Sequence, residues 1–165
     1  MSFSLLPTMY IPSLTGLTPE KLKQRGVHLL MLDFDNTIVP YTTSVPEPVM
    51  DQWLKDMLKS DIKLCVVSNS VNKRVEAFCK PYGLDCITHA RKPLPIGIHR
   101  CLNRYQIFPE NSAIAGDQIF TDTLGGNCAG VQTILVAPID NHNFLLKARH
   151  VLEMPFVIAA KKRSV

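Results

Sequence analysis

The stretch Leu30-Met31-Leu32-Asp33-Phe34-Asp35-Asn36-Thr37 decides the fold, because an apolar run ends there at two carboxylates one residue apart. The run predicts a buried β-strand, with both acids where its C-terminal end meets the next loop. Open α/β sheets keep their active sites at that edge. Two carboxylates brought together repel each other unless a cation or a proton lies between them. The stretch therefore indicates a site for Mg²⁺, which is held by carboxylates, water and substrate phosphate, although Asp-x-Asp also occurs in turns and calcium loops.

Length and composition favour one globular domain over residues 1–165. The 165-residue chain is 46% hydrophobic, which is enough for a sizeable core. Its net charge of +4 is spread along the sequence, so it suits anionic substrates or membrane surfaces and predicts no nucleic-acid partner. The five cysteines show no paired spacing and follow no secretory signal, which favours a reduced, cytoplasmic setting. No apolar stretch approaches the roughly 20 residues that span a bilayer.

The N-terminal segment is apolar without resembling a targeting peptide. It lacks an early basic residue and is interrupted by Pro7 and Pro12. We expect residues 1–26 to form a strap packed on the domain. The alternative is a peripheral contact with a membrane surface, to which the basic run Lys161-Lys162-Arg163 would contribute.

Strand-like and helix-like segments alternate after the first strand. This alternation predicts a single α/β domain with a doubly wound, mainly parallel sheet and helices on both faces. The further strands are expected at Lys63–Val67, Cys86–His89, Ser112–Ala115 and Thr133–Val136. The helices are expected at Pro46–Lys59, Val71–Lys80, Ile96–Tyr105, Gly125–Ala129 and Asn143–Leu152.

Polar side chains recur where these predicted strands end. The candidates are Asp33, Asp35, Ser68, Asn69, Lys92, Asp117 and Asp122. Each has a simpler interpretation: Ser68 as a helix cap, Lys92 as an ordinary surface lysine, Asp122 as an acid favoured by a helix dipole. Because the C-terminal ends of parallel strands meet at one edge of a sheet, we expect carboxylates, a hydroxyl and an ammonium group to come together there.

These residues also carry a resemblance to a known family. The sequence Asp33-Phe34-Asp35-Asn36-Thr37 resembles motif I of the haloacid dehalogenase (HAD) superfamily, Asp-x-Asp-x-Thr. Motifs II, III and IV are matched in order by Ser68, by Lys92, and by Gly116-Asp117 with Asp122. More narrowly, nearly the whole chain resembles the YqeG family of class IIIA HAD phosphatases. Further features of that pattern are Leu6-Pro7, Tyr10, Ser13-Leu14, Val66–Asn69, Arg91–Pro93, Gly116–Gln118, Thr121-Asp122, Gly125–Asn127 and Thr133–Val136. Cys128 departs from it, because a basic residue is expected after Gly-Gly-Asn.

The resemblance implies a capless HAD fold and a phosphoaspartyl mechanism dependent on Mg²⁺. In such a mechanism Asp33 is the nucleophile and Asp35 the general acid and base. The metal is held by Asp33, the Asp35 backbone carbonyl and Asp117. The expected phosphate-binding residues are Thr37, Ser68, Asn69 and Lys92, and Asp122 is a second-rank candidate for holding Lys92 or a metal-bound water.

Insert lengths bear on the substrate. Only about thirty residues separate Thr37 from Ser68, and one helix with its loops and a strand accounts for them, so no cap domain of at least about 50 residues fits. An open cleft accepts a phosphomonoester displayed on a lipid surface or another large molecule. Mitochondrial relatives of the YqeG group are phosphatidylglycerophosphate phosphatases, which implies a phospholipid substrate at a membrane surface. The alternatives are a soluble phosphomonoester, a phosphoprotein, or a binding module that keeps the fold.

Overall fold

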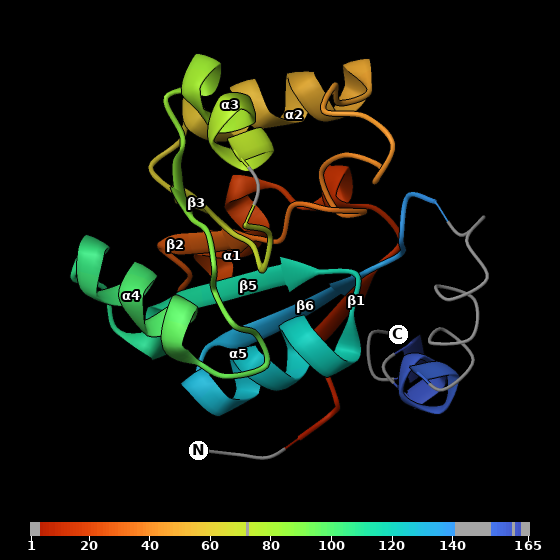
Figure 1. The fold of residues 1–165 in the computed structure, drawn as a ribbon. Coiled ribbons are helices and arrows are strands. Elements are labelled where there is room, and N and C mark those ends of the chain that lie inside the picture. The colour runs from red at the N-terminus through yellow and green to blue at the C-terminus, as the bar shows by residue number, and fades with distance from the viewer. Residues whose placement is uncertain (1–3, 72, 141–152, 160, 163–165) are drawn as a thin grey trace.

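The computed structural model describes residues 4–71, 73–140, 153–159 and 161–162. Within these ranges, six strands form one sheet in the order β1-β6-β5-β2-β3-β4, and every neighbouring pair is parallel (Figure 1). The strands are β1 Met9–Ile11, β2 Leu29–Leu32, β3 Lys63–Val67, β4 Asp85–Ile87, β5 Ser112–Gly116 and β6 Gln132–Val136. The predicted parallel, doubly wound sheet is confirmed.

Strand β2 lies inside the sheet between β5 and β3, and all four of its side chains are buried. Alternate side chains of a strand point to opposite faces of the sheet. Leu30 and Leu32 accordingly join the hydrophobic core on one face, whereas Leu29 and Met31 join the core on the other. This two-sided burial explains why the strand is apolar throughout rather than alternating with polar residues.

Helices cover both faces of the sheet. Buried side chains of α1, α2 and α3 belong to the core that contains Leu30, and those of α4 and α5 belong to the core that contains Leu29. Figure 1 shows α2 and α3 on one side of the strands and α4 and α5 on the other. The helices are α1 Pro19–Gln24, α2 Pro48–Leu58, α3 Lys73–Tyr82, α4 Ile96–Tyr105 and α5 Leu124–Ala129, with short helical turns η1 Leu14–Gly16, η2 Pro109–Asn111 and η3 Ile119–Thr123; residues 153–159 are also helical.

The N-terminal segment contributes more than a strap. Met9–Ile11 pairs with β6 as the edge strand β1, and Pro19–Gln24 forms α1, neither of which the sequence analysis predicted. Both are too short, and too close to prolines, to show a periodic pattern. Thr8 and Thr133 exchange hydrogen bonds between backbone N–H and side-chain oxygen at 3.0 and 3.1 Å, and these bonds fix the register of the edge strand.

Asn127, part of the Gly-Gly-Asn feature, also has a structural role in this segment. Its side-chain amide donates to the carbonyl oxygens of Ser4 and Leu6, at 2.6 and 3.1 Å. The neighbouring Cys128 is buried, so it offers no surface contact. The helix predicted at Asn143–Leu152 lies wholly within 141–152, outside the described residues.

The connections between the central strands leave the C-terminal edge of the sheet open. The chain between β2 and β3 contains one helix, α2, and the chain between β3 and β4 contains α3. No cap domain is inserted in either connection, as expected. Among the described residues, no helix has the length and apolar character needed to cross a membrane.

Candidate active site

The predicted site residues follow adjacent strands of the sheet. Asp33 comes directly after β2, and its N–H continues the pairing by donating to the carbonyl of Ala115 at 2.9 Å. Ser68 comes directly after β3 and donates in the same way to Ile87. Asp117 follows β5. From β2 the chain adds β3 and then β4 on one side, and it returns to add β5 on the other side of β2. The direction of strand order therefore reverses at β2, which makes the C-terminal edge of the sheet there a topological switch point.

Lys92, in the loop after β4, joins two carboxylates. Its Nζ lies 2.6 Å from Asp33 Oδ1 and 2.6 Å from Asp122 Oδ1. The side chains of Lys92 and Asp122 are each 2% exposed and that of Asp33 is 9% exposed. Asn69 fixes the lysine backbone: its amide donates to the Lys92 carbonyl at 2.8 Å, and its oxygen accepts from the Lys92 N–H at 2.7 Å.

Burial and charge oppose each other in this group. Burial raises the pKa of Asp33 to about 7, with Lys92 opposing that rise and Asp122 adding to it. For Lys92, burial favours the neutral amine, but the carboxylates of Asp122 and Asp33 outweigh burial and raise its pKa above the ordinary lysine value. Lys92 is therefore an ammonium ion at neutral pH. It supplies the positive charge that allows two carboxylates to be buried side by side.

The carboxylates beside Lys92 have the composition of a metal site. One oxygen from each of Asp33, Asp117 and Asp122 can be chosen so that all three lie within 4.8 Å of one another. Both oxygens of Asp122 accept hydrogen bonds, one from Lys92 and one from the Gln118 N–H, whereas Lys92 contacts only one oxygen of Asp33. Asp33 and Asp117 are therefore the better pair for a cation. The Thr37 hydroxyl lies between these two, 3.5 Å from Asp33 Oδ2 and 3.4 Å from Asp117 Oδ1. Buried carboxylate oxygens are the donors that Mg²⁺ prefers, so these residues fit a hard divalent cation.

A cleft of about 240 Å³ opens above these carboxylates. Its lining consists of Asp33, Asp35, Tyr41, Ser68, Asn69, Ser70, Lys92, Gln118 and Thr121. The structure thus brings five of the predicted residues to one surface. Thr37, Asp117 and Asp122 are buried and do not line the cleft. Ser68 lines the cleft, and its hydroxyl accepts from the Ser70 N–H at 3.0 Å. Because α3 begins at Lys73, this bond belongs to a turn, and Ser68 does not cap the helix.

Comparisons with known proteins agree with this geometry. A family model described as HAD-hydrolase-like matches residues 89–138. The protein named "Probable phosphatase YqeG" from Bacillus subtilis (strain 168) is 34% identical over 160 residues, which cover 96% of this chain and 93% of the relative. The chain belongs to the YqeG-type phosphatases of the HAD superfamily.

Solved structures with low identity share the HAD fold. The 3-deoxy-D-manno-octulosonate 8-phosphate phosphatase from Yersinia pestis aligns with a TM-score of 0.55 and 18% identity, covering 90% of each chain. The corresponding phosphatase from Haemophilus influenzae, solved in a cobalt-bound form, aligns with a TM-score of 0.56 and 14% identity, covering 87% of this chain and 94% of that one. At these identities the likeness shows the fold alone.

Two residues that the sequence analysis missed support the HAD motif residues. Asn36 turns the chain within motif I with φ of 65°, a conformation that Asn tolerates better than most residues. Its amide donates to Asp117 Oδ2 at 3.2 Å and to the Asp140 carbonyl at 3.0 Å. Its side-chain oxygen accepts from the Asp140 N–H at 2.8 Å. The loop after β6 is thereby tied to Asp117, the predicted metal ligand. The motif leaves this position variable, so it gave no signal.

Arg74, on α3, is the second missed residue. Its Nη1 lies 2.5 Å from Asp35 Oδ1, and its Nη2 donates to the carbonyls of Pro40, at 2.8 Å, and Thr43. Its guanidinium carbon also lies 5.0 Å from the centre of the Phe34 ring. Arg74 therefore holds the Asp35 carboxylate and the loop after motif I together. The sequence feature that could have indicated Arg74 is its position as an arginine early in the helix that follows Ser68.

Asp122 reaches Lys92 because residue 116 is glycine. A Cβ atom at Gly116 would lie 2.3 Å from Asp122 Cγ, so any larger residue would displace the carboxylate. The other oxygen of Asp122 accepts from the Gln118 N–H at 3.2 Å. The buried Glu153 accepts from the N–H groups of Ile119 and Phe120 and so holds the start of η3. These three bonds fix the segment that carries Asp122.

Replacement of Lys92 by Met is expected to lower the free energy of unfolding by about 3–5 kcal/mol in metal-free buffer, because two buried carboxylates lose their cation. Lys23→Met is the matched control. Lys23 Nζ lies 2.8 Å from Asp61, a similar distance, but both side chains are exposed, so the loss of this pair is expected to leave the free energy of unfolding nearly unchanged. Urea unfolding followed by circular dichroism measures both. Equal losses of unfolding free energy in the two variants would contradict the buried ion pairs of Lys92 with Asp33 and Asp122.

Proposed function

We propose that this HAD phosphatase hydrolyses a phosphomonoester through an aspartyl-phosphate on Asp33, with Mg²⁺ as its metal. The observation that carries the proposal is the buried Lys92 ammonium, 2.6 Å from the Asp33 carboxylate at the floor of a cleft that Asp35 also lines. A nucleophile, a candidate acid and a fixed positive charge therefore converge on one small volume. A binding module has no physical need for such a cluster of costly buried charges.

In the first step a carboxylate oxygen of Asp33 attacks phosphorus, and the bond from phosphorus to the ester oxygen breaks. The leaving oxygen takes a proton from Asp35 and departs as the alcohol. In the second step Asp35 removes a proton from water, the water oxygen attacks phosphorus, and inorganic phosphate leaves with Asp33 restored. The splitting of one hard displacement into two explains why the two acids stand one residue apart.

The other site residues bind charged groups or orient the residues that react. Lys92 and the Ser68 hydroxyl bind the phosphoryl oxygens while negative charge is redistributed in the transition state. Asn69 positions Lys92 through the two backbone bonds described above. Bound Mg²⁺, held by Asp33, Asp117 and the Asp35 backbone carbonyl, would neutralise the charge that keeps the phosphate and the nucleophile apart. Thr37 is assigned to orienting Asp33 and Asp117, since its hydroxyl also accepts from the Asp117 N–H at 3.1 Å.

Phosphatidylglycerophosphate is the substrate that we propose. The connections that would carry a cap hold single helices, so a phosphate displayed at a surface can reach the cleft. The cleft volume of about 240 Å³ is below the range of roughly 300–1,000 Å³ that encloses whole small molecules. Only the phosphoryl end of a substrate fits inside. We further propose a cytoplasmic protein that meets this lipid at the membrane surface through a peripheral contact.

Phosphate release from phosphatidylglycerophosphate in mixed micelles with Mg²⁺ is the test of this function. We expect turnover of the lipid to exceed that of soluble sugar phosphates, nucleotides and phosphopeptides, and Asp33→Asn to abolish it, because an amide cannot form the aspartyl-phosphate. Turnover of soluble esters alone would retain the mechanism and reject the lipid. No turnover by folded, metal-loaded protein would favour the binding module.

Replacement of Asp35 by Asn tests the general acid. For an alkyl phosphate, kcat is expected to fall by about 10²–10⁴, because an alkoxide departs badly without a proton. For p-nitrophenyl phosphate the first step is expected to suffer far less, since its leaving phenolate is stable. Burst kinetics that resolve release of the phenolate from later hydrolysis make the comparison. Equal losses of the burst rate for both esters would reject Asp35 as the acid.

Addition of Mg²⁺ is expected to raise the unfolding temperature, because a ligand bound only to the folded state stabilises it. At one hundred times the dissociation constant the gain is about 2.7 kcal/mol. Asp117→Asn should remove most of this gain. The control is Asp61→Asn, which removes an exposed carboxylate far from the cleft residues and should keep the gain. Equal Mg²⁺ shifts in all three proteins would contradict the assigned ligands.

A further inference from the structure

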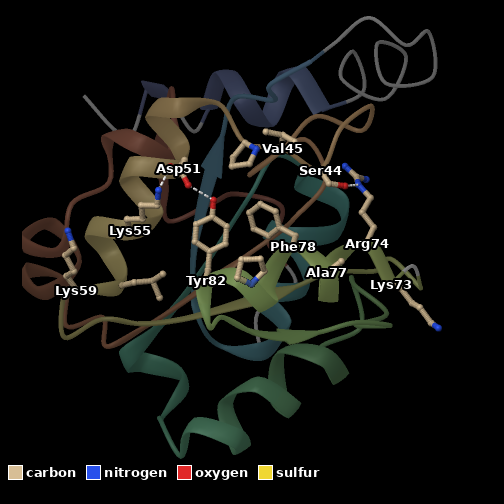
Figure 2. A pocket seen from close by; sticks show the side chains of 13 residues that line it. Ser44, Val45, Asp51, Lys55, Lys59, Lys73, Arg74, Ala77, Phe78 and Tyr82 are labelled. Carbon is tan, nitrogen blue, oxygen red and sulfur yellow. Dashed lines mark hydrogen bonds and ion pairs between the residues drawn. The ribbon is translucent and has the colours of Figure 1, made fainter.

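A groove of about 910 Å³ lies between α2 and α3 (Figure 2). It is nearly four times the volume of the active-site cleft. Its lining consists of Ser44, Val45, Pro46, Asp51, Lys55, Leu58, Lys59, Lys73, Arg74, Ala77, Phe78, Pro81 and Tyr82. The mechanism proposed above uses none of this volume.

The groove has an apolar lining and a basic rim. Phe78 and Tyr82 stack with ring centres 5.2 Å apart, and Figure 2 shows both rings inside the groove. Leu58 and Val45 line it with 37% and 72% of their surfaces exposed. The remaining lining includes the cationic side chains Lys55, Lys59, Lys73 and Arg74.

Asp51, the acidic residue of the lining, is already neutralised. Its carboxylate accepts from the Tyr82 hydroxyl at 2.5 Å and from Lys55 Nζ at 2.7 Å (Figure 2). These bonds lower the pKa of Asp51, with the Lys55 bond contributing most. Two further cations of the lining are also paired, Lys59 with Asp56 at 3.5 Å and Arg74 with Asp35. The excess of positive charge around the groove is therefore small, and it is compatible with the single phosphate of an otherwise apolar molecule.

One end of the groove adjoins the active site. Arg74 lines the groove, and its Nη1 lies 2.5 Å from Asp35 Oδ1, a carboxylate that lines the cleft. Arg74 Nε also donates to Ser44 Oγ at 2.8 Å, so the Arg74 guanidinium links a residue of the groove lining to a carboxylate of the cleft lining. Asp35 is the residue proposed to protonate the leaving group, so the leaving group faces the side of the cleft on which Arg74 and the groove lie.

We propose that the groove between α2 and α3 binds the hydrocarbon part of the phosphomonoester substrate. This inference rests on the proposed function, because it assigns a place to the part of the substrate that the cleft excludes. A cleft of about 240 Å³ holds little more than the phosphoryl end, and the adjoining surface is apolar and open. A carbon chain lying there is shielded from water when the phosphate is drawn into the cleft.

A series of monomeric n-alkyl phosphates tests the groove without micelles. Each methylene that moves from water into an apolar site improves binding by up to about fourfold. We expect kcat/KM to rise at least about tenfold from butyl phosphate to octyl phosphate, and further for decyl phosphate. Independence of kcat/KM from chain length, with every ester turned over, would overturn the groove proposal while leaving the phosphatase intact.

Variants on α3 distinguish binding of the alkyl chain in the groove from a non-specific effect of its hydrophobicity. Ala77→Trp fills the groove from an exposed position, so it should flatten the dependence on chain length. Glu76→Trp is the matched control, because it adds the same ring to the same helix at an exposed position that does not line the groove. Its chain-length dependence should equal that of the original protein. A steep dependence that survives Ala77→Trp would overturn the proposal.

A polar variant and a binding measurement complete the test. Leu58→Ser makes the half-exposed end of α2 polar without filling the groove. It should reduce the ratio of kcat/KM for octyl phosphate to kcat/KM for butyl phosphate by about threefold or more.

If no ester is hydrolysed, the proposed function fails, and calorimetry with octylphosphonate tests the groove separately. Tighter binding of octylphosphonate than butylphosphonate, lost in Ala77→Trp, supports the groove. Equal binding of the two phosphonates overturns it.

Discussion

The ammonium group of Lys92, buried between the carboxylates of Asp33 and Asp122, is the interaction on which the active site depends. It joins three segments that are far apart in sequence: the end of β2, the loop after β4 and the turn after β5. In a low-dielectric interior two facing carboxylates would repel each other or take up a proton. Because Lys92 supplies a fixed positive charge, the carboxyl group of Asp33 can remain buried. Asn69 serves this arrangement by fixing the lysine backbone rather than its charge.

The parallel sheet supplies the geometry that this charge needs. All strands point their C-terminal ends to the same edge, so residues that follow β2, β3 and β5 meet without any long loop. A further set of side chains holds the loops there. Asn36 ties the loop after β6 to Asp117, and Arg74 ties the loop after motif I to Asp35. Glu153 fixes η3 from a segment late in the chain. The residues that perform chemistry thus depend on others that only orient them.

The active-site cleft and the groove between α2 and α3 differ in size and polarity, and this difference relates the proposed mechanism to the proposed substrate. The cleft is polar and small, and the groove beside it is apolar, basic at its rim and much larger. Their common boundary is Arg74, whose guanidinium contacts both the Asp35 carboxylate and the loop that borders the groove. A phosphomonoester with a long apolar alcohol would use both hollows, whereas a compact sugar phosphate would place its phosphoryl end in the cleft and leave the groove empty. The proposed binding mode therefore assigns substrate choice to the surface next to the cleft.

The sequence by itself determined the elements with a strong pattern and the chemistry of the motifs. The strand at Lys63–Val67 and the helix at Ile96–Tyr105 have the predicted bounds, because burial imposes a clear periodicity on each. The spacing of Asp33, Ser68, Lys92 and Asp117 placed them at one edge of the sheet, since parallel strands leave no other arrangement. Only the tertiary structure decided that Met9–Ile11 is a strand, that Arg74 holds Asp35, and that α2 and α3 leave a groove between them. These features arise from contacts between segments distant along the chain, and such contacts leave no periodic or local signal in the sequence.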